Sequence, residues 1–134
     1  MAKNDWLPIA ETAKKVQAGE ISATDQVKQS LRLIKEHSDY NSIITVLEKP
    51  SLERANDVDN RVKNGETIGR LAGVPFIAKD NFLVFGSDTT AASNILKGFE
   101  APYQATVINK LEAEGAICVA KANLDAFAHG ASTE

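Results

Sequence analysis

The sequence predicts an α/β fold in which parallel strands are flanked by helices. Two short segments, residues 73–78 and 116–120, are apolar at nearly every position, as expected of strands that helices cover on both faces. Residues 103–114, which lie between them, place apolar side chains at helical spacing. A strand, a helix and a second strand in this order form a right-handed crossover, so the two strands should lie parallel in one sheet.

The first half of the chain is predicted to supply covering helices and one further strand. Apolar residues recur at helical spacing before Gly19, and again after a capping signal at residues 22–25. Residues 42–47 are rich in β-branched side chains and predict a strand. A third helix is expected to begin at Ser51 and to end at residues 64–65, where Asn and Gly form a turn signal.

Shorter elements are expected after the first of the two apolar strands. Residues 81–85 form a second apolar segment that ends in a turn, and residues 88–93 are small and polar. Short hydroxyl side chains suit a loop that packs closely under a site, and they equally suit a helix cap. Asn123 is expected to cap a last helical turn at residues 124–128.

The composition fits one globular domain and excludes several classes of function. The chain has 134 residues, of which 43% are hydrophobic and 25% are charged. A net charge of −3 gives no basic surface for nucleic acids or anionic membranes. Cys118 is the single cysteine, so no internal disulfide can form, and its apolar neighbours place it in the core. No segment resembles a signal peptide or a membrane span, so we expect a cytoplasmic protein without a membrane partner.

Lys79 directly follows the first apolar strand, and the functional prediction depends on it. Burying a lysine is costly unless it is paired, because a low dielectric disfavours the charged ammonium. The same cost favours the neutral amine, which can act as a base. Two interpretations therefore stand at this point. Either Lys79 extends from the strand end into water, or it is a desolvated base in a cleft.

An internal repeat links Lys79 to a second lysine. Residues 76–81 and 118–123 share the pattern apolar-apolar-Ala-Lys-x-Asn. If the two strands are parallel, Lys79 and Lys121 should emerge at the same edge of the sheet. This edge holds the carboxyl ends of the strands, where the sites of α/β proteins commonly form.

Other common catalytic and binding motifs are missing from the sequence. It contains no Gly-x-Gly-x-x-Gly fingerprint, no P-loop and no Cys or His cluster suited to a metal. Ser132 is the nearest candidate for a nucleophile, but the glycine that should follow in a Gly-x-Ser-x-Gly elbow is absent. Ser–Lys chemistry, in which a neutral lysine takes the proton of a serine, suits Lys79 as the base and leaves the nucleophile unassigned.

Residues 71–81, Leu-Ala-Gly-Val-Pro-Phe-Ile-Ala-Lys-Asp-Asn, resemble the lysine motif of the amidase signature family. Within that family they are most similar to the A subunits of glutamyl-tRNA(Gln) amidotransferases. Further segments agree with the family in the same order along the chain. They are residues 89–93, 105–107, 111–115, 121–127 and 132–134.

This resemblance implies a mixed sheet covered by helices, and hydrolysis of a carboxamide by a Ser–cis-Ser–Lys triad. Lys79 matches the general base of that triad, which passes protons through the bridging serine. Ser132 corresponds to a loop position beside the substrate amide, although Ala131 and His129 replace the residues that are usual nearby.

The resemblance also implies partners. In the amidotransferase, the ammonia released from glutamine travels to a partner subunit that amidates Glu on mischarged tRNA. The implied partners are therefore the B and C subunits, with tRNA involved only indirectly. No cofactor is expected in this chain, because ATP and Mg²⁺ would be used by a partner subunit.

The family's Gly/Ser-rich segment, which carries both serines and the oxyanion hole, would follow residue 134. We therefore expect a single N-terminal piece of a larger amidase domain, with residues 1–40 as a helical region and residues 41–134 as the start of the α/β core. Such a piece should be inactive alone and should self-associate through uncovered apolar surface. Two alternatives stay open: a piece of a general carboxamide amidase, and a non-catalytic α/β module that oligomerises.

Overall fold

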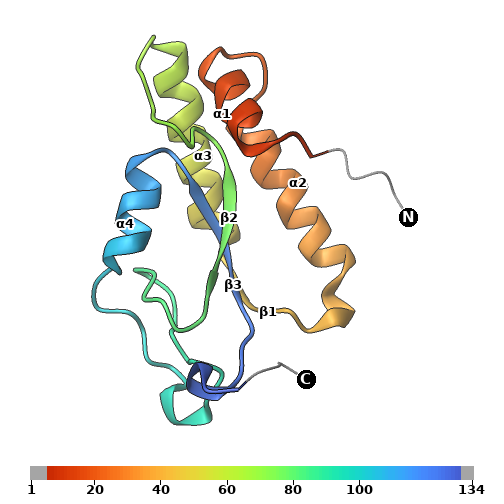
Figure 1. The fold of residues 1–134 in the computed structure, drawn as a ribbon, viewed down its shortest axis with the longest axis vertical. Helices are drawn as coiled ribbons and strands as arrows, with labels where there is room; N and C mark the ends of the chain where they lie inside the picture. Colours follow the sequence, from red (N-terminus) through yellow and green to blue (C-terminus); the bar gives the residue numbers. More distant parts are fainter. Residues whose placement is uncertain (1–5, 131–134) are drawn as a thin grey trace.

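The computed structural model describes residues 6–130 and has the predicted α/β architecture (Figure 1). The chain begins with α1 (Ile9–Gln17) and α2 (Ala23–Glu36), followed by β1 (Ile43–Val46) and α3 (Glu48–Lys63). It continues with β2 (Pro75–Lys79), α4 (Thr106–Ala113) and β3 (Ile117–Ala122). Short 3-10 helices lie at Ser38–Tyr40, Asn94–Leu96 and Ala126–Ala128.

The sheet has the strand order β1-β3-β2. β2 pairs with β3 in parallel, which confirms the strand–helix–strand prediction, and β1 pairs with β3 antiparallel. β3 is the central strand, and its first five residues are buried. Within the described residues, β1 and β2 are therefore both edge strands.

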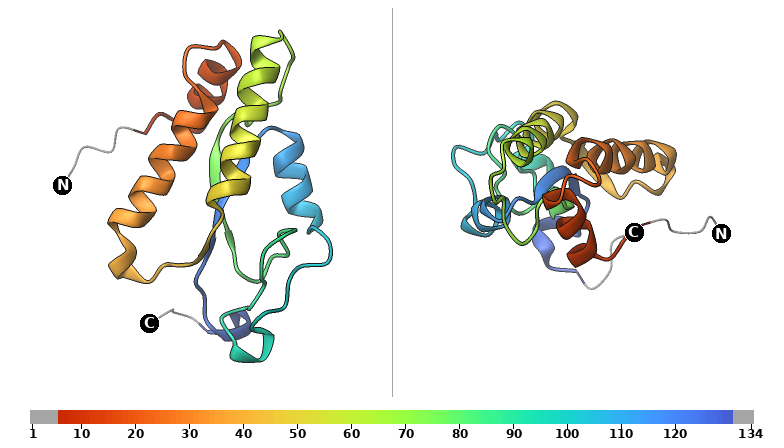
Figure 2. Two further views of the ribbon diagram at one scale, coloured as in Figure 1. Left: turned by 180° about the vertical axis from the view of Figure 1, so that it is seen from behind. Right: turned by 90° about the horizontal axis from the view of Figure 1, so that it is seen from above.

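Helices cover the sheet from two sides. α2 and α3 pack together behind it, while α4 lies on the other side of β2 and β3 (Figures 1 and 2). The larger core joins the N-terminal helices to β3. Its main members are Val16, Val27, Ala55, Val58, Ile117 and Val119. A smaller core lies toward α4 and contains Leu47, Ala78, Val84, Ile108 and Cys118.

Several predicted boundaries are wrong for local reasons. α3 begins at Glu48 rather than Ser51, because Pro50 lies in its first turn, where a missing N–H costs nothing. α4 begins at Thr106 rather than Tyr103. Ile77 was expected to be buried, but it is 47% exposed because β2 is an edge strand.

Asp59 of α3 caps the N-terminus of α2 across the helix pair. Its carboxylate accepts hydrogen bonds from the Ala23 N–H at 2.7 Å, from the Thr24 N–H at 3.0 Å, and from the Ser22 and Thr24 hydroxyls. Burial alone would raise the pKa of Asp59. The hydrogen bonds from Thr24, Ser22 and the backbone outweigh burial and lower the pKa.

We expect Asp59→Ala to lower the free energy of unfolding by about 1–2 kcal/mol at pH 7, the usual cost of losing a helix cap. Because the folded-state pKa is lowered, this contribution is present above the unfolded-state pKa and is lost as the pH falls through the folded value. Urea unfolding of both proteins at pH 7 and below about pH 4 measures the difference. An effect of equal size at both pH values would contradict this assignment.

Cys118 lies in the smaller core and is 5% exposed, as predicted. Burial is the main cause that raises the pKa of its thiol to about 11. We expect less than about a tenth of the thiol to react with Ellman's reagent at pH 8 in the native protein, because the thiolate is the reactive form. All of it should react in urea. Rapid labelling of the native protein would show that β3 is accessible.

Candidate functional site

The carboxyl ends of β2 and β3 lie side by side and hold the residues singled out from the sequence. Lys79 is the last residue of β2 and is exposed. The next residue extends the pairing, since the Asp80 N–H donates to the Ala122 carbonyl at 3.0 Å. Within residues 6–130, the Lys79 ammonium has no ion-pair or hydrogen-bond partner. Of the two interpretations left open, this arrangement matches the lysine that extends into water.

Lys121, and not Lys79, is the buried lysine of the structure. Its ammonium lies 2.8 Å from Asp80 Oδ1, and both side chains are fully buried. It also donates to the Asp88 carbonyl at 3.2 Å and to Thr89 Oγ1 at 3.4 Å. One close carboxylate oxygen and two hydrogen-bond acceptors surround this ammonium, so its charge is compensated, although Asp80 Oδ1 itself accepts no hydrogen bond from the described residues.

The two lysines therefore share one end of the sheet but not one face. The parallel register aligns Lys121 with Ala78 and Lys79 with Ala122. Side chains alternate between faces along a strand, so this offset of one residue sends the two ammonium groups in opposite directions. As expected, the two strands end at the same edge of the sheet. The expectation that Lys121 emerges there is wrong, because its side chain turns inward to Asp80.

Asp80 also fixes the loop that follows β2. Its second carboxylate oxygen accepts from the Thr90 N–H at 3.0 Å and from the Thr90 hydroxyl, and its carbonyl accepts from the Ala91 N–H at 3.2 Å. The small, polar stretch 88–93 thus packs directly against the buried ion pair. The sequence left a close-packed loop and a helix cap open for this stretch, and Thr89 and Thr90 take the first role, with their hydroxyls and nearby backbone groups contacting the pair.

Two short segments beside the ion pair adopt the left-handed backbone conformation without glycine. Ala91 and Ala92 have φ values of 48° and 53°, and Phe127 and Ala128 have 55° and 58°. The Phe127 N–H donates to the Ala91 carbonyl at 2.9 Å, so the two segments are joined. Such conformations cost energy, persist only where the surroundings enforce them, and cluster at functional sites.

Chemically, this end of the sheet offers one exposed lysine side chain, Lys79, on a rigid support. A strand, a buried ion pair and two hydrogen-bonded loops fix the backbone around Lys79, while its side chain stays open to an incoming group. Ser132, the other predicted site residue, lies outside the described residues. Asp80 was not predicted from the sequence. A buried lysine such as Lys121 needs a buried counter-charge, and Asp80, which directly follows Lys79 in the sequence, supplies it.

No three His, Cys, Asp or Glu side chains among residues 6–130 are grouped so that they could hold a metal ion. His37 stacks on Tyr40, with 5.3 Å between ring centroids. None of the helices described is both long and apolar enough to cross a membrane.

The structure is that of an α/β protein with a helix-covered mixed sheet and a lysine at the end of a parallel strand. The family model described as Amidase matches residues 25–134, and the chain belongs to this family. The chain is 42% identical over 125 residues to the A subunit of the mitochondrial glutamyl-tRNA(Gln) amidotransferase of Homo sapiens, which is 93% of this chain and 24% of the human protein.

Solved structures share the fold. The native peptide amidase from Stenotrophomonas maltophilia superposes with a TM-score of 0.85 at 27% identity, covering 96% of this chain and 26% of the amidase. An inhibitor-bound vestigial complex, linked to the origins of an s-triazine catabolic enzyme, gives a TM-score of 0.88 at 28% identity, covering 92% of this chain and 28% of that one. The chain spans about a quarter of the length of the curated relatives it matches.

Proposed function

We propose that this chain is the N-terminal part of an amidase domain and supplies Lys79 as the general base for hydrolysis of a carboxamide. The observation that carries the proposal is the position of Lys79. Its side chain is exposed, stands at the carboxyl end of a parallel strand, and sits on a backbone fixed by the Asp80–Lys121 pair. A general base needs such firm placement and no competing partner within its own unit.

In this proposal, neutral Lys79 Nζ takes a proton from a bridging serine, which takes one from the serine that attacks the amide carbon. The proton then passes back to the departing nitrogen, so that ammonia leaves and an acyl-serine remains for water to hydrolyse. Neither serine is assigned to a residue of this chain. We therefore expect the chain alone to release no ammonia from any amide, because loss of the nucleophile removes the covalent step.

We propose glutamine as the substrate, in an amidotransferase of the A-subunit type. The support is the higher identity to the human A subunit, 42%, than to the peptide amidase, 27%. The partners would then be B and C subunits, with ATP and Mg²⁺ used by a partner and tRNA contacted only indirectly. The human relative is named as mitochondrial, so imaging of a tagged chain is needed to test the proposed cytoplasmic location.

A chimera tests the proposal. This chain replaces the matching quarter of the human A subunit, and ammonia release from glutamine is measured in the presence of its partner subunits. We expect Lys79→Met to lower kcat by about 10²–10⁴-fold, the usual contribution of a general base. The control is Lys97→Met, which removes a lysine outside the site. Equal kcat values for the two variants would show that Lys79 is not the base.

A further inference from the structure

A groove of about 660 Å³ lies between α2, β1 and the start of α3. Four half-buried apolar side chains that pack against the larger core form its floor: Leu31, Ile34, Ile43 and Leu52. Val46 of β1 also lines the groove and is 47% exposed. The larger core is therefore incompletely covered on this side of the molecule.

One wall of the groove is a basic stripe on α2, formed by Lys28, Arg32 and Lys35. These residues follow one another at intervals of four and three, so they lie along one face of the helix, and all three are exposed. Within residues 6–130, the only ion pair of the stripe joins Arg32 to Glu36 at 3.8 Å, and both of these side chains are at least half exposed. Such an exposed pair is weak, so the positive charge of the stripe is available to a partner.

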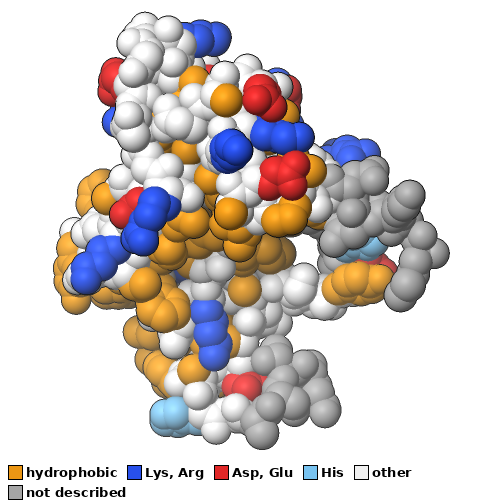
Figure 3. Space-filling view, turned by 45° about the horizontal axis from the view of Figure 1, so that its top comes forward, with side chains coloured by type: hydrophobic (Ala, Val, Ile, Leu, Met, Phe, Trp, Pro, Cys, Tyr) orange, Lys and Arg blue, Asp and Glu red, His pale blue; other side chains and the backbone are white. Residues whose placement is uncertain are grey.

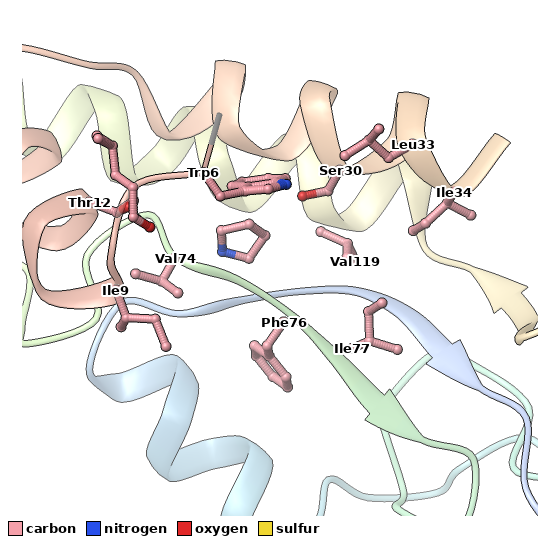
Figure 4. A pocket seen from close by; sticks show the side chains of 12 residues that line it. Trp6, Ile9, Thr12, Ser30, Leu33, Ile34, Val74, Phe76, Ile77 and Val119 are labelled. Atoms are coloured by element: carbon pink, nitrogen blue, oxygen red, sulfur yellow. The ribbon is translucent and has the colours of Figure 1, made fainter. Parts of the chain in front are cut away.

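The charge of this groove departs from that of its surroundings. The chain has a net charge of −3, and acidic and basic side chains lie interspersed over the upper part of the face in Figure 3. The groove beside the other edge strand, β2, has no charged residue in its lining, and Figure 4 shows mainly apolar side chains there. In the groove beside β1, three cationic residues stand against one acidic residue, Glu48.

We propose that the groove beside β1 binds an acidic amphipathic helix of a partner protein. An apolar floor selects a partner with an apolar face, as in other grooves that bind helices. The basic stripe extends over about 10 Å, at 1.5 Å per residue from Lys28 to Lys35, which is too far for one anionic headgroup to neutralise. A row of carboxylates at the same helical spacing can pair with all three cations, which provides specificity.

Glu48 determines how the acidic row must lie. It lines the groove from the start of α3, on the side away from the basic stripe. A carboxylate of the partner placed beside Glu48 would be repelled, since like charges brought together in an interface are unfavourable. The acidic row of the partner therefore lies against α2, and its other flank is neutral or basic.

A synthetic peptide tests the groove. The probe is a fluorescein-labelled peptide of about 18 residues, long enough to form a helix, with leucines on one face and a row of glutamates along one flank. In the control peptide, lysines replace the glutamates. Fluorescence anisotropy with the chain should show that the glutamate peptide binds at least about tenfold more tightly, and that added salt weakens its binding by screening the exposed charges. Equal affinities for the two peptides would overturn the proposal.

Charge reversal identifies the residues that bind the peptide. Lys28→Glu combined with Lys35→Glu should weaken binding of the glutamate peptide at least about tenfold. The matched control is Lys14→Glu combined with Lys110→Glu, which makes the same change in net charge at exposed lysines outside the groove. It should change the affinity less than about twofold, because charges beyond a Debye length are screened. Equal losses for the two double variants would show that net charge governs binding, and would overturn the proposal.

Thiol protection locates the peptide without altering the basic stripe. Cys118 is buried, so a thiol introduced by Val46→Cys reports on the groove. This thiol should react with Ellman's reagent about tenfold more slowly when the glutamate peptide is bound, while the thiol of Ile77→Cys, at an equally exposed position of β2, should react at an unchanged rate. No protection of Val46→Cys would overturn the proposal. Protection by a single-stranded oligonucleotide, or by the chain itself as its concentration rises, would overturn it in favour of a nucleic acid or a second copy.

This inference and the proposed function can be tested separately. The groove lies beside β1, and Lys79 ends β2 at the opposite edge of the sheet. Lys79→Met should therefore leave the affinity for the glutamate peptide unchanged while it lowers ammonia release by the chimera. A Lys79→Met chain that no longer binds the peptide would place the binding surface at the end of β2 and contradict the inference.

Discussion

Lys121→Met is expected to lower the free energy of unfolding by about 3–5 kcal/mol, since it leaves the Asp80 carboxylate buried without its counter-charge. This loss approaches the whole stability of many domains, so the variant should be partly unfolded at 25 °C. Urea unfolding followed by circular dichroism measures it. The loop at residues 88–93 should loosen as well, because Asp80 anchors it through Thr90.

Lys79→Met provides the matched control. Both substitutions remove one lysine ammonium at the same end of the sheet, but Lys79 is exposed and makes no ion pair among residues 6–130. Its substitution should change the free energy of unfolding by less than about 0.5 kcal/mol. Asp80→Asn combined with Lys121→Met should recover most of the loss, because it removes the unpaired charge. Similar losses for the two single lysine variants would refute the structural role of Lys121.

Gly115→Ala is expected to cost about 2–5 kcal/mol, the sum of a left-handed backbone penalty and a clash in a packed region. Gly115 has a φ of +89°, and a Cβ there would lie 2.5 Å from Ile68 Cγ2 and 2.9 Å from Ala72 Cα. One of these neighbours is backbone, so it cannot move aside without disturbing the turn before β2. Thermal or urea unfolding of the variant gives the value.

Gly65→Ala separates the two contributions. Gly65 also has a positive φ, +78°, but no atom lies within 4 Å of the position its Cβ would take. Only the backbone penalty applies, so the expected cost is about 1–2 kcal/mol. Equal losses of unfolding free energy for Gly65→Ala and Gly115→Ala would show that the close contact of Gly115 with residues 68–72 adds nothing to the cost of substitution.

The sequence predicted the crossover because its signals are local and redundant. Two apolar runs separated by a helical pattern leave few topologies open, and the parallel pairing of β2 with β3 is the result. The position of β2 at the edge of the sheet could not be predicted in this way. Ile77 has the same apolar character as buried strand residues, and its exposure depends on which neighbour is present.

The different environments of the two lysines could not be predicted from the sequence either. Lys79 and Lys121 occupy equivalent places in the repeated pattern, and the sequence alone treats them alike. Their environments are opposite, because an offset of one residue in register turns Lys121 toward Asp80 and Lys79 away from it. Register depends on pairing between segments about forty residues apart along the chain, which no local pattern encodes.

Chemical rescue of Lys79 tests the central claim most directly. In the chimera with the human A subunit, Lys79→Ala removes the amine but leaves space for a small amine added to the buffer. If Lys79 acts as a base, ethylamine should restore ammonia release from glutamine at least about tenfold, and the rescue should grow with pH as the neutral amine increases. A Lys79→Ala chimera that keeps full activity, or one that no amine rescues although it folds and binds its partners, would contradict the claim.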